Sequence, residues 1–297
     1  MQLRNPFTAP GKWCKANFHT HTTTSDGRAS PEETAQLYRR AGYQVLALTD
    51  HWATNDVTGL SSRNFLVVSG IEYHPVCPGR DRGNPHHLVG VNVPHGFAFP
   101  KREDTDPNAA IRAVRRAGGE SFLAHPLWCG HRYDHYAGLK GLIGVEVYNA
   151  TCDRIGRSGG DHDWCYLLDE GRVLGGLAVD DTHGPGDRFR GWVWLKLEEL
   201  TVPAVMDALR TGCYFSSTGP RITDFRVAGG EVTVRCTPAE FVYLVAQTYH
   251  GARRMAEEGK AIRKFTCQIP PAWQYVRAVV VDHQGRKAWS NPVHGLH

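Results

Sequence analysis

Two histidines near the start of the chain have the spacing of a metal-binding pair. His19 and His21 stand two residues apart in a short apolar stretch, so their side chains would point to the same face of a β-strand. Histidine is the commonest metal ligand, and the chain has 16 histidines among 297 residues. An isolated His-x-His pair is more often structural, so its meaning depends on what accompanies it.

Further histidines and carboxylates accompany this pair. Asp26 follows His21 by five residues in a Ser-Asp-Gly turn, and other residues stand where further apolar runs begin or end: Asp50, His51, Glu72, His86, His87, His125, Asp181 and His183. Each of these residues taken alone is more simply explained as structural. Because so many of them coincide with the ends of predicted strands, chance is a poor explanation, and together they indicate a metal centre.

The elements that would position these residues follow from short apolar runs bounded by turn residues. Strands are predicted at 16–20, 44–49, 65–71, 87–93, 121–124, 142–147, 173–179 and 192–197. Helices are predicted at 32–41, where Ser30, Pro31 and Glu33 form a capping box, from Asp106-Pro107 to Gly118-Gly119, and from Thr201 to Arg210. Strands that alternate with helices predict a parallel sheet, and seven or eight repeats in about 220 residues predict a barrel.

The pattern changes after Gly219-Pro220. Strand-like runs occur at 222–227, 231–236, 241–247, 265–269 and 276–282. No long helical pattern separates them, and the turns at Gly229-Gly230 and Gln284-Gly285 suit hairpins. We therefore predict a barrel domain over residues 1–221 and a small antiparallel β-rich domain over residues 222–297.

Composition excludes several classes of protein. Hydrophobic residues make up 41% and charged residues 22%, which is typical of a globular chain. A net charge of +4 without a basic run argues against a nucleic-acid partner. No apolar stretch is long enough for a signal peptide or a membrane span. The eight cysteines include no Cys-x-x-Cys pair, so we expect a cytoplasmic protein with reduced, mostly buried thiols. The oligomeric state is left open.

The motifs together resemble one family. His19-Thr20-His21, Ser25-Asp26-Gly27, Thr49-Asp50-His51, Gly70-Ile71-Glu72, His87, His125-Pro126 and Asp181-Thr182-His183 resemble the PHP (polymerase and histidinol phosphatase) metallohydrolases over about residues 14–200. The segments 144–149, 214–220 and 288–292 resemble the CehA/McbA-like branch. The resemblance implies a distorted, TIM-like (β/α)7 barrel with two or three divalent metal ions.

The resemblance also implies a set of ligands. His19, His21 and Asp181 would hold one metal, Glu72 would bridge to a second held by His87 and His125, and Asp26, His51 and His183 would hold a third. Nitrogen and oxygen donors without a thiolate suit Zn²⁺, Mn²⁺ or Fe²⁺. Some members have a histidine where this chain has Asp26, a departure that weakly favours Mn²⁺ or Fe²⁺ in the third site.

Several nearby residues keep alternative interpretations. His87 is preferred to His86 as a ligand, which leaves His86 as a loop residue or as a partner of a ligand. Asp50 would orient a ligand or form a cap, and His74 would line the site or lie in a loop. Glu146 is a support for the site, a substrate contact or a buried structural carboxylate.

The chemistry expected is metal-dependent hydrolysis, most simply of a phosphoester. A hydroxide shared by metals about 3.5–4 Å apart, held by His19, His21, Glu72 and Asp181, would attack a small phosphorylated metabolite or nucleotide. Arg157 and Arg188 are candidates to bind the phosphate, and His162 is a candidate acid, although it could equally be a neighbour of a helix cap. The alternatives are a carboxyl- or carbamate-ester hydrolase on the same metals, or a non-catalytic metal-binding PHP module.

Overall fold

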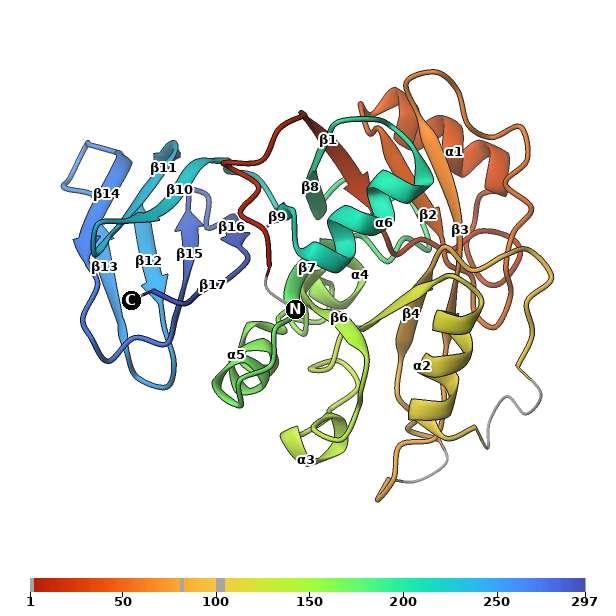
Figure 1. Cartoon of the computed structure of the whole chain (residues 1–297). Helices are drawn as coiled ribbons and strands as arrows, with labels where there is room; N and C mark the ends of the chain where they lie inside the picture. Colours follow the sequence, from red (N-terminus) through yellow and green to blue (C-terminus); the bar gives the residue numbers. More distant parts are fainter. Residues whose placement is uncertain (1–2, 81–82, 100–104, 297) are drawn as a thin grey trace.

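The computed structural model describes residues 3–80, 83–99 and 105–296 (Figure 1). The helices are α1 Pro31–Arg40, α2 Pro107–Arg116, α3 Tyr133–Tyr136, α4 Ala150–Asp153, α5 Asp161–Asp169 and α6 Val202–Thr211. The strands up to residue 217 are β1 Lys12–Asn17, β2 Val45–Leu48, β3 Leu66–Tyr73, β4 Leu88–Val91, β5 Glu120–Leu123, β6 Leu142–Asn149, β7 Gly175–Val179, β8 Trp192–Leu197 and β9 Tyr214–Ser217. The remaining strands are β10 Ile222–Ala228, β11 Glu231–Ala239, β12 Phe241–Val245, β13 Gly251–Met255, β14 Ile262–Gln268, β15 Tyr275–Val281, β16 Lys287–Ser290 and β17 Val293–His294.

The first eight strands form one continuous part of the main sheet, in the order β8-β1-β2-β3-β4-β5-β6-β7. The pairs β1·β2, β2·β3, β5·β6 and β6·β7 are parallel. All eight predicted strands are found, with ends that differ by a few residues. The α/β class predicted from the sequence is therefore confirmed.

Strand β4 runs against both of its neighbours, which corrects the prediction of an all-parallel sheet. A parallel neighbour needs a crossover connection, usually a helix. The described residues between β3 and β4 contain no helix, and the segment is rich in proline and glycine. The antiparallel direction places the start of β4, rather than its end, beside the end of β3.

The sheet is also not the closed barrel that the alternation of elements predicted. Its hydrogen-bonded path ends at β7, and the chain after β7 meets the chain after β1 at an isolated bridge between Thr20 and Thr182. The described residues contain fewer helices than a (β/α)7 barrel requires, and α3 and α4 have four residues each. The barrel is thus open at one seam, and the polar residues of interest lie at that seam.

The three predicted helices form, and their caps are those expected from the sequence. Ser30 accepts a hydrogen bond from the Glu33 backbone N–H at 3.2 Å, while the Glu33 carboxylate accepts one from the Ser30 N–H at 3.0 Å. Asp106 caps α2, and Gly212 ends α6 with φ of 66°, a conformation that glycine adopts without strain. Helix α5, which has no side-chain cap, was not predicted.

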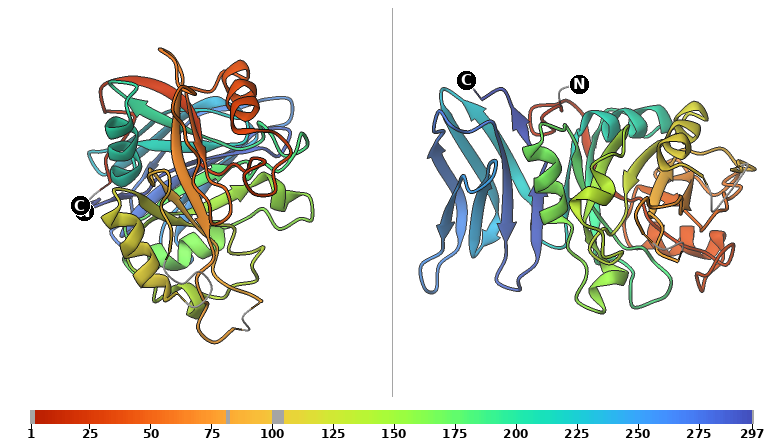
Figure 2. Two further views of the ribbon diagram at one scale, coloured as in Figure 1. Left: turned by 90° about the vertical axis from the view of Figure 1, so that its right-hand side faces the viewer. Right: turned by 90° about the horizontal axis from the view of Figure 1, so that it is seen from below.

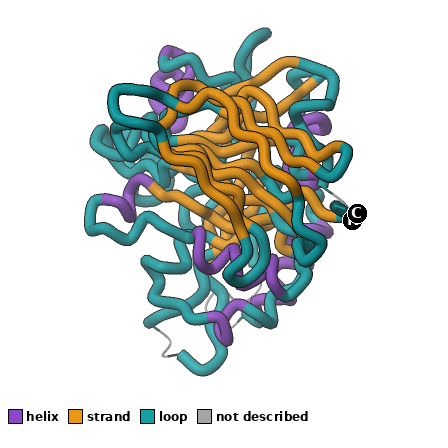
Figure 3. Tube along the Cα trace, turned by 90° about the vertical axis from the view of Figure 1, so that its left-hand side faces the viewer, coloured by secondary structure: helices purple, strands orange, loops and turns teal. Residues whose placement is uncertain are grey.

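The C-terminal strands extend the main sheet rather than stand apart from it. Strand β16 pairs with β9, and β15, β12 and β13 follow it in order. A separate three-stranded sheet, β10-β11-β14, packs against this extension around an apolar core that includes Phe225, Val234 and Val280. Figure 3 shows these strands in front of the rest of the chain. The right-hand view of Figure 2 shows them at one end of the molecule, with the helices toward the other end. No helix in the described residues is long and apolar enough to cross a membrane.

Candidate metal centre

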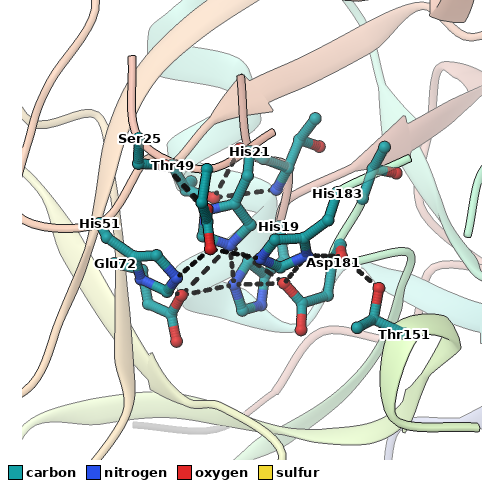
Figure 4. Close-up of polar contacts among 12 residues, drawn as sticks. His19, His21, Ser25, Thr49, His51, Glu72, Thr151, Asp181 and His183 are labelled. Atoms are coloured by element: carbon teal, nitrogen blue, oxygen red, sulfur yellow. Dashed lines mark hydrogen bonds and ion pairs between the residues drawn. The ribbon is translucent and has the colours of Figure 1, made fainter. Parts of the chain in front are cut away.

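The open seam of the sheet brings His19 and His21 together with Asp181 and His183 (Figure 4). Strand β1 ends at Asn17, so His19 and His21 lie just beyond it rather than on it. The Asp181 N–H donates to the His19 carbonyl at 2.9 Å, and the His21 N–H donates to the Thr182 carbonyl at 3.0 Å. These bonds hold the ends of β1 and β7 side by side, with both imidazoles turned toward Asp181.

Four buried side chains converge at this point. The Nε2 atoms of His19 and His21 are 3.1 Å apart. Each lies 3.2 Å from Glu72 Oε2, and they lie 3.2 and 3.0 Å from Asp181 Oδ1. All four side chains are at most 5% exposed.

These distances fit a divalent cation better than a set of direct hydrogen bonds. Ligand atoms about 2.1 Å from a common ion are separated by roughly 3.0–3.4 Å, which is the spacing seen here. Glu72 Oε2 and Asp181 Oδ1 are buried and have no hydrogen-bond partner among the described residues. Buried carboxylate oxygens without partners are unfavourable, and a cation between them would remove that cost.

The second oxygen of Glu72 faces a different group of histidines. Glu72 Oε1 lies 2.8 Å from His87 Nδ1, 3.3 Å from His125 Nε2 and 3.5 Å from His74 Nε2. Because β4 runs antiparallel to β3, His87, which directly precedes β4, lies at the same end of the sheet as Glu72. Glu72 therefore stands between two groups of imidazoles, with one oxygen toward each.

A third group lies toward solvent. Asp26 Oδ2 is 3.3 Å from His183 Nε2 and 3.5 Å from His51 Nε2, and its side chain is 53% exposed. His51 Nδ1 in turn lies 3.0 Å from Glu72 Oε2. The donors of His21, Asp26, His51 and His183 all lie within 4.8 Å of one another, as do those of His19, His21, Glu72 and Asp181. All nine sequence-predicted ligands thus lie in one continuous cluster.

Glu146 fixes the orientation of this cluster from behind. Its Oε1 accepts from His19 Nδ1 at 2.6 Å, and its Oε2 accepts from the His125 N–H and from Asn149 Nδ2 at 2.9 Å each. Asn149 also donates to Asp181 Oδ2 at 3.0 Å. With a proton on Nδ1, the lone pair of His19 Nε2 points into the cluster. Of the interpretations left open for Glu146, support of the site fits, whereas the part played by Asn149 was not predicted.

Asp50 organises the loop that carries Asp26 and does not face the cluster. Its carboxylate accepts from the Thr22 and Ser25 backbones and from both of their hydroxyls, at 2.6–3.1 Å. Asn55 donates to it at 2.6 Å. Of the two roles predicted for Asp50, the cap is the one that fits these contacts.

The electrostatics of the cluster reflect the negative charge of its carboxylates. Burial lowers the pKa of His19, but Asp181, Glu146 and Glu72 outweigh it and raise that pKa well above its usual value. Burial also lowers the pKa of His51, but Asp26 and Glu72 together outweigh burial and raise that pKa to about 10. Burial raises the pKa of Glu72, yet the surrounding histidines hold it well below its usual range. The site therefore attracts positive charge, whether protons or cations.

Backbone strain occurs at the same place. His125 and Asp181 have φ of 23° and 51°, values that side-chain-bearing residues rarely adopt. The hydrogen bonds from their N–H groups to Glu146 and to His19 hold these conformations. Strained residues of this kind are concentrated at functional sites.

Other residues considered from the sequence lie elsewhere. Arg157 and His162 are exposed, the latter with its ring 4.5 Å from that of Tyr166. Arg188 lies in a groove beside α1 that Arg28 and Arg40 also line. No hydrogen bond or ion pair joins Arg157, Arg188 or His162 to the cluster in the described part of the chain.

Two features of the surroundings were not predicted. Cys129 Sγ lies 3.5 Å from His125 Nδ1, so one thiol borders a cluster that was expected to have none. The spacing of four residues between His125 and Cys129, which is that of one helical turn, was the sequence feature that could have indicated this contact. His86, which was interpreted as a loop residue or as a partner of a ligand, instead lies with His131 and Cys77 in a separate buried group.

Comparison with known proteins supports the fold. No protein-family model matches the sequence, and no curated protein matches it. A two-domain protein from Bacteroides vulgatus, described as containing a predicted PHP-like metal-dependent phosphoesterase, is similar over 95% of this chain and 94% of its own, with 16% identity and a TM-score of 0.56. At this identity the similarity establishes a shared fold, which confirms the PHP-like architecture expected from the sequence.

Two further solved structures are similar over smaller parts. An amidohydrolase from Chromobacterium violaceum covers 58% of this chain and 88% of its own, with 19% identity and a TM-score of 0.43. The lesion-specific endonuclease EndoQ from Pyrococcus furiosus covers 67% of this chain and 56% of its own, with 12% identity and a TM-score of 0.42. These scores are too low to support an argument.

Proposed function

We propose that this chain, which has the fold of a PHP-like protein, is a metal-dependent phosphoesterase acting on a small phosphorylated molecule. The observation that carries the proposal is the convergence of four buried side chains, His19, His21, Glu72 and Asp181. The Nε2 atom of each histidine lies 3.0–3.2 Å from one oxygen of each carboxylate. The phosphoester class is supported by the description of the Bacteroides vulgatus protein with which the fold is shared. We also retain the distorted barrel of the family, and the CehA/McbA-like branch, as part of the proposal.

The proposed ligands follow the three groups of the cluster. His19, His21 and Asp181 would hold one divalent ion, Glu72 would bridge to another held by His87 and His125, and Asp26, His51 and His183 would hold a third. Zn²⁺, Mn²⁺ and Fe²⁺ suit these donors. When bound, such ions lower the pKa of water and neutralise negative charge that develops on a phosphoryl oxygen.

The chain's own residues prepare the site for this chemistry. Glu146 keeps the proton of His19 on Nδ1, so that Nε2 is free for an ion. The exposed edge formed by Asp26, His51 and His183 leaves the cluster open to a substrate from one side. We keep Arg157 and Arg188 as proposed phosphate contacts and His162 as a proposed acid for the leaving group.

The test is phosphate release from a panel of monoesters and diesters with added Mn²⁺. The wild-type chain should turn over at least one ester, and Glu72→Ala or His19→Ala should lose at least about 100-fold in kcat/KM, because each removes a ligand to an ion. His283→Ala, which changes an exposed histidine far along the chain from the cluster, should leave kcat/KM unchanged. The Arg157→Met, Arg188→Met double variant should raise KM for phosphate esters.

Other outcomes would contradict parts of the proposal. Turnover of aryl carboxyl esters or carbamates without phosphate release would reject the phosphoester class but keep the metal centre. Full activity of both Glu72→Ala and His19→Ala would reject the metal centre. A metal content below about two ions per folded chain, with no turnover of any ester, would favour a non-catalytic metal-binding module.

A further inference from the structure

We propose that Cys77, His86 and His131 form a second, separate metal site, which takes a single structural Zn²⁺. One donor atom from each of these residues lies within 4.8 Å of the other two. None of the three belongs to the histidine–carboxylate cluster described above. The proposal therefore stands independently of the proposed hydrolase activity.

All three side chains are buried. Cys77 is 5% exposed, His86 is fully buried and His131 is 8% exposed. Both ring nitrogens of His86, and Nδ1 of His131, have no hydrogen-bond partner among the described residues. A buried polar atom without a partner is unfavourable, so three such atoms in one place call for a bound group.

The orientation of His131 is that of a metal ligand. Its Nε2 lies 3.2 Å from the Pro85 carbonyl, so the proton belongs on Nε2 and the lone pair on Nδ1, the atom without a partner. Metal-binding histidines usually donate their other N–H to a backbone carbonyl in this way. Pro85 is also the residue before His86, so the same contact joins the two ligands.

The donor chemistry selects zinc. One thiolate and two imidazoles are typical zinc ligands, whereas Mn²⁺ prefers oxygen. Three protein donors are one fewer than the four of a closed structural zinc site, so water or another small ligand would complete the tetrahedron. The guanidinium of Arg80 donates to the Gly130 and Cys129 carbonyls at 2.8 and 3.2 Å. These bonds hold the Cys77 loop against the loop that carries His131.

The site would connect two segments that border the main cluster. His86 directly precedes His87, and His131 lies in the turn that follows His125. An ion held by Cys77, His86 and His131 would therefore fix the start of β4 and the loop after β5 relative to each other. Its expected role is structural, because the site is buried and does not face the solvent-exposed edge at Asp26.

The thiolate allows this site to be observed apart from the main one. Full-length protein loaded with Co²⁺ should show a near-ultraviolet thiolate-to-cobalt charge-transfer band. Cys77→Ser should abolish that band and lower the bound metal, measured by mass spectrometry, by one equivalent per chain. Cys129→Ser, which removes the thiol beside His125, is the matched control and should keep both the band and the metal count.

His131→Ala provides a second variant in case Cys77→Ser does not fold. It should also lose one equivalent of metal, and both variants should unfold at a lower temperature than the wild type in the presence of Zn²⁺ but not in the presence of a chelator. Absence of the band in the wild-type protein would overturn the proposal. So would a band that disappears in Cys129→Ser and persists in Cys77→Ser.

Discussion

Two imidazoles of the main cluster are oriented by hydrogen bonds from their Nδ1 atoms. His19 donates from Nδ1 to Glu146, and His183 Nδ1 lies 2.8 Å from the Asp181 carbonyl. In each ring the opposite nitrogen faces the carboxylates. The protein thereby sets which nitrogen keeps its proton when an ion binds, and the ligand geometry depends on residues such as Glu146 that would make no contact with an ion.

Glu146→Gln should weaken metal binding about 10- to 100-fold. Glu146 accepts hydrogen bonds on both oxygens, from His19, from the His125 N–H and from Asn149. An amide can accept on only one side, so its NH₂ group would face another donor. The dissociation constant should be measured by competition with a chelator.

Glu120→Gln is the matched control for this measurement. Glu120 is also mostly buried but pairs with Arg115 at 3.1 Å, away from the cluster, and its replacement should leave the dissociation constant unchanged. Equal affinity of Glu146→Gln and the wild type would show that Glu146 does not position His19.

At this scale the sequence indicated which residues converge, but only part of what supports them. Most of the nine clustered residues stand at the ends of apolar runs, a pattern visible along the chain, and the family resemblance completed the set with Asp26. Asn149 and Cys129 lie within or after such runs and act through contacts between distant segments. The separation of His86 from His87 likewise depends on how the loop after β3 folds back, which residue spacing does not specify.

The direction of β4 is the main consequence of element packing for the site. A parallel β4 would carry His87 to the opposite end of the sheet from Glu72. The antiparallel strand instead pairs Gly70 with Val91 and Glu72 with Val89, which leaves His87 beside Glu72. The close pairing of β3 with β4 at Gly70 therefore helps to place a proposed ligand.

Gly70→Ala should lower the free energy of unfolding by about 1–3 kcal/mol. A Cβ atom at this position would lie 2.6 Å from the Gly90 carbonyl oxygen and 2.8 Å from Thr49 Cγ2. The carbonyl belongs to the paired strand and cannot move without disturbing the sheet. Urea unfolding followed by circular dichroism measures the change.

Gly138→Ala is the control for this substitution. A Cβ atom added at Gly138 would have no other atom within 4 Å, and the φ of Gly138 is not positive. The change should therefore be neutral or stabilising by up to about 1 kcal/mol. If both variants unfold at the same urea concentration as the wild type, the β3·β4 contact has no steric importance.

Helices and strands with clear local signals were the ones predicted. Helices α1, α2 and α6 have proline and a side-chain cap at their start, whereas α5 begins without a side-chain cap. Strand β13 is almost wholly exposed and reads Gly-Ala-Arg-Arg-Met, so it lacks the apolar alternation that marks a strand. Its structure comes from pairing with β12, which is a tertiary contact.

At the scale of the whole molecule, the two predicted domains are joined by more than a linker. The main sheet continues from β9 into β16 and β15. Tyr275, Val279 and Trp289 from these strands pack in the same apolar cluster as Trp164 and Leu167 of α5. We therefore propose that the boundary at residue 221 separates two structural units that unfold as one.

Arg277 is the polar centre of this contact. Its side chain is 2% exposed, its Nη2 lies 3.2 Å from Asp161 Oδ1, and its guanidinium carbon lies 4.4 Å from the Trp164 ring centroid. The other oxygen of Asp161 accepts from Trp289 Nε1 at 2.8 Å. Strands β15 and β16 are thus both tied to the first turn of α5.

Arg277→Met should lower the free energy of unfolding by about 3 kcal/mol, because it leaves a carboxylate without its partner in a mostly buried contact. Urea unfolding should be followed by both tryptophan fluorescence and far-ultraviolet circular dichroism. The wild type should give coincident transitions, and Arg277→Met should shift both together.

Arg226→Met is the matched control. It breaks an ion pair within the C-terminal strands, to Asp224 at 2.8 Å, but the Arg226 side chain is 61% exposed. That pair should contribute less than about 1 kcal/mol. Two separate transitions in the wild type would show that the C-terminal strands are an independent domain, and the contact at Arg277 would then serve docking rather than the stability of the whole chain.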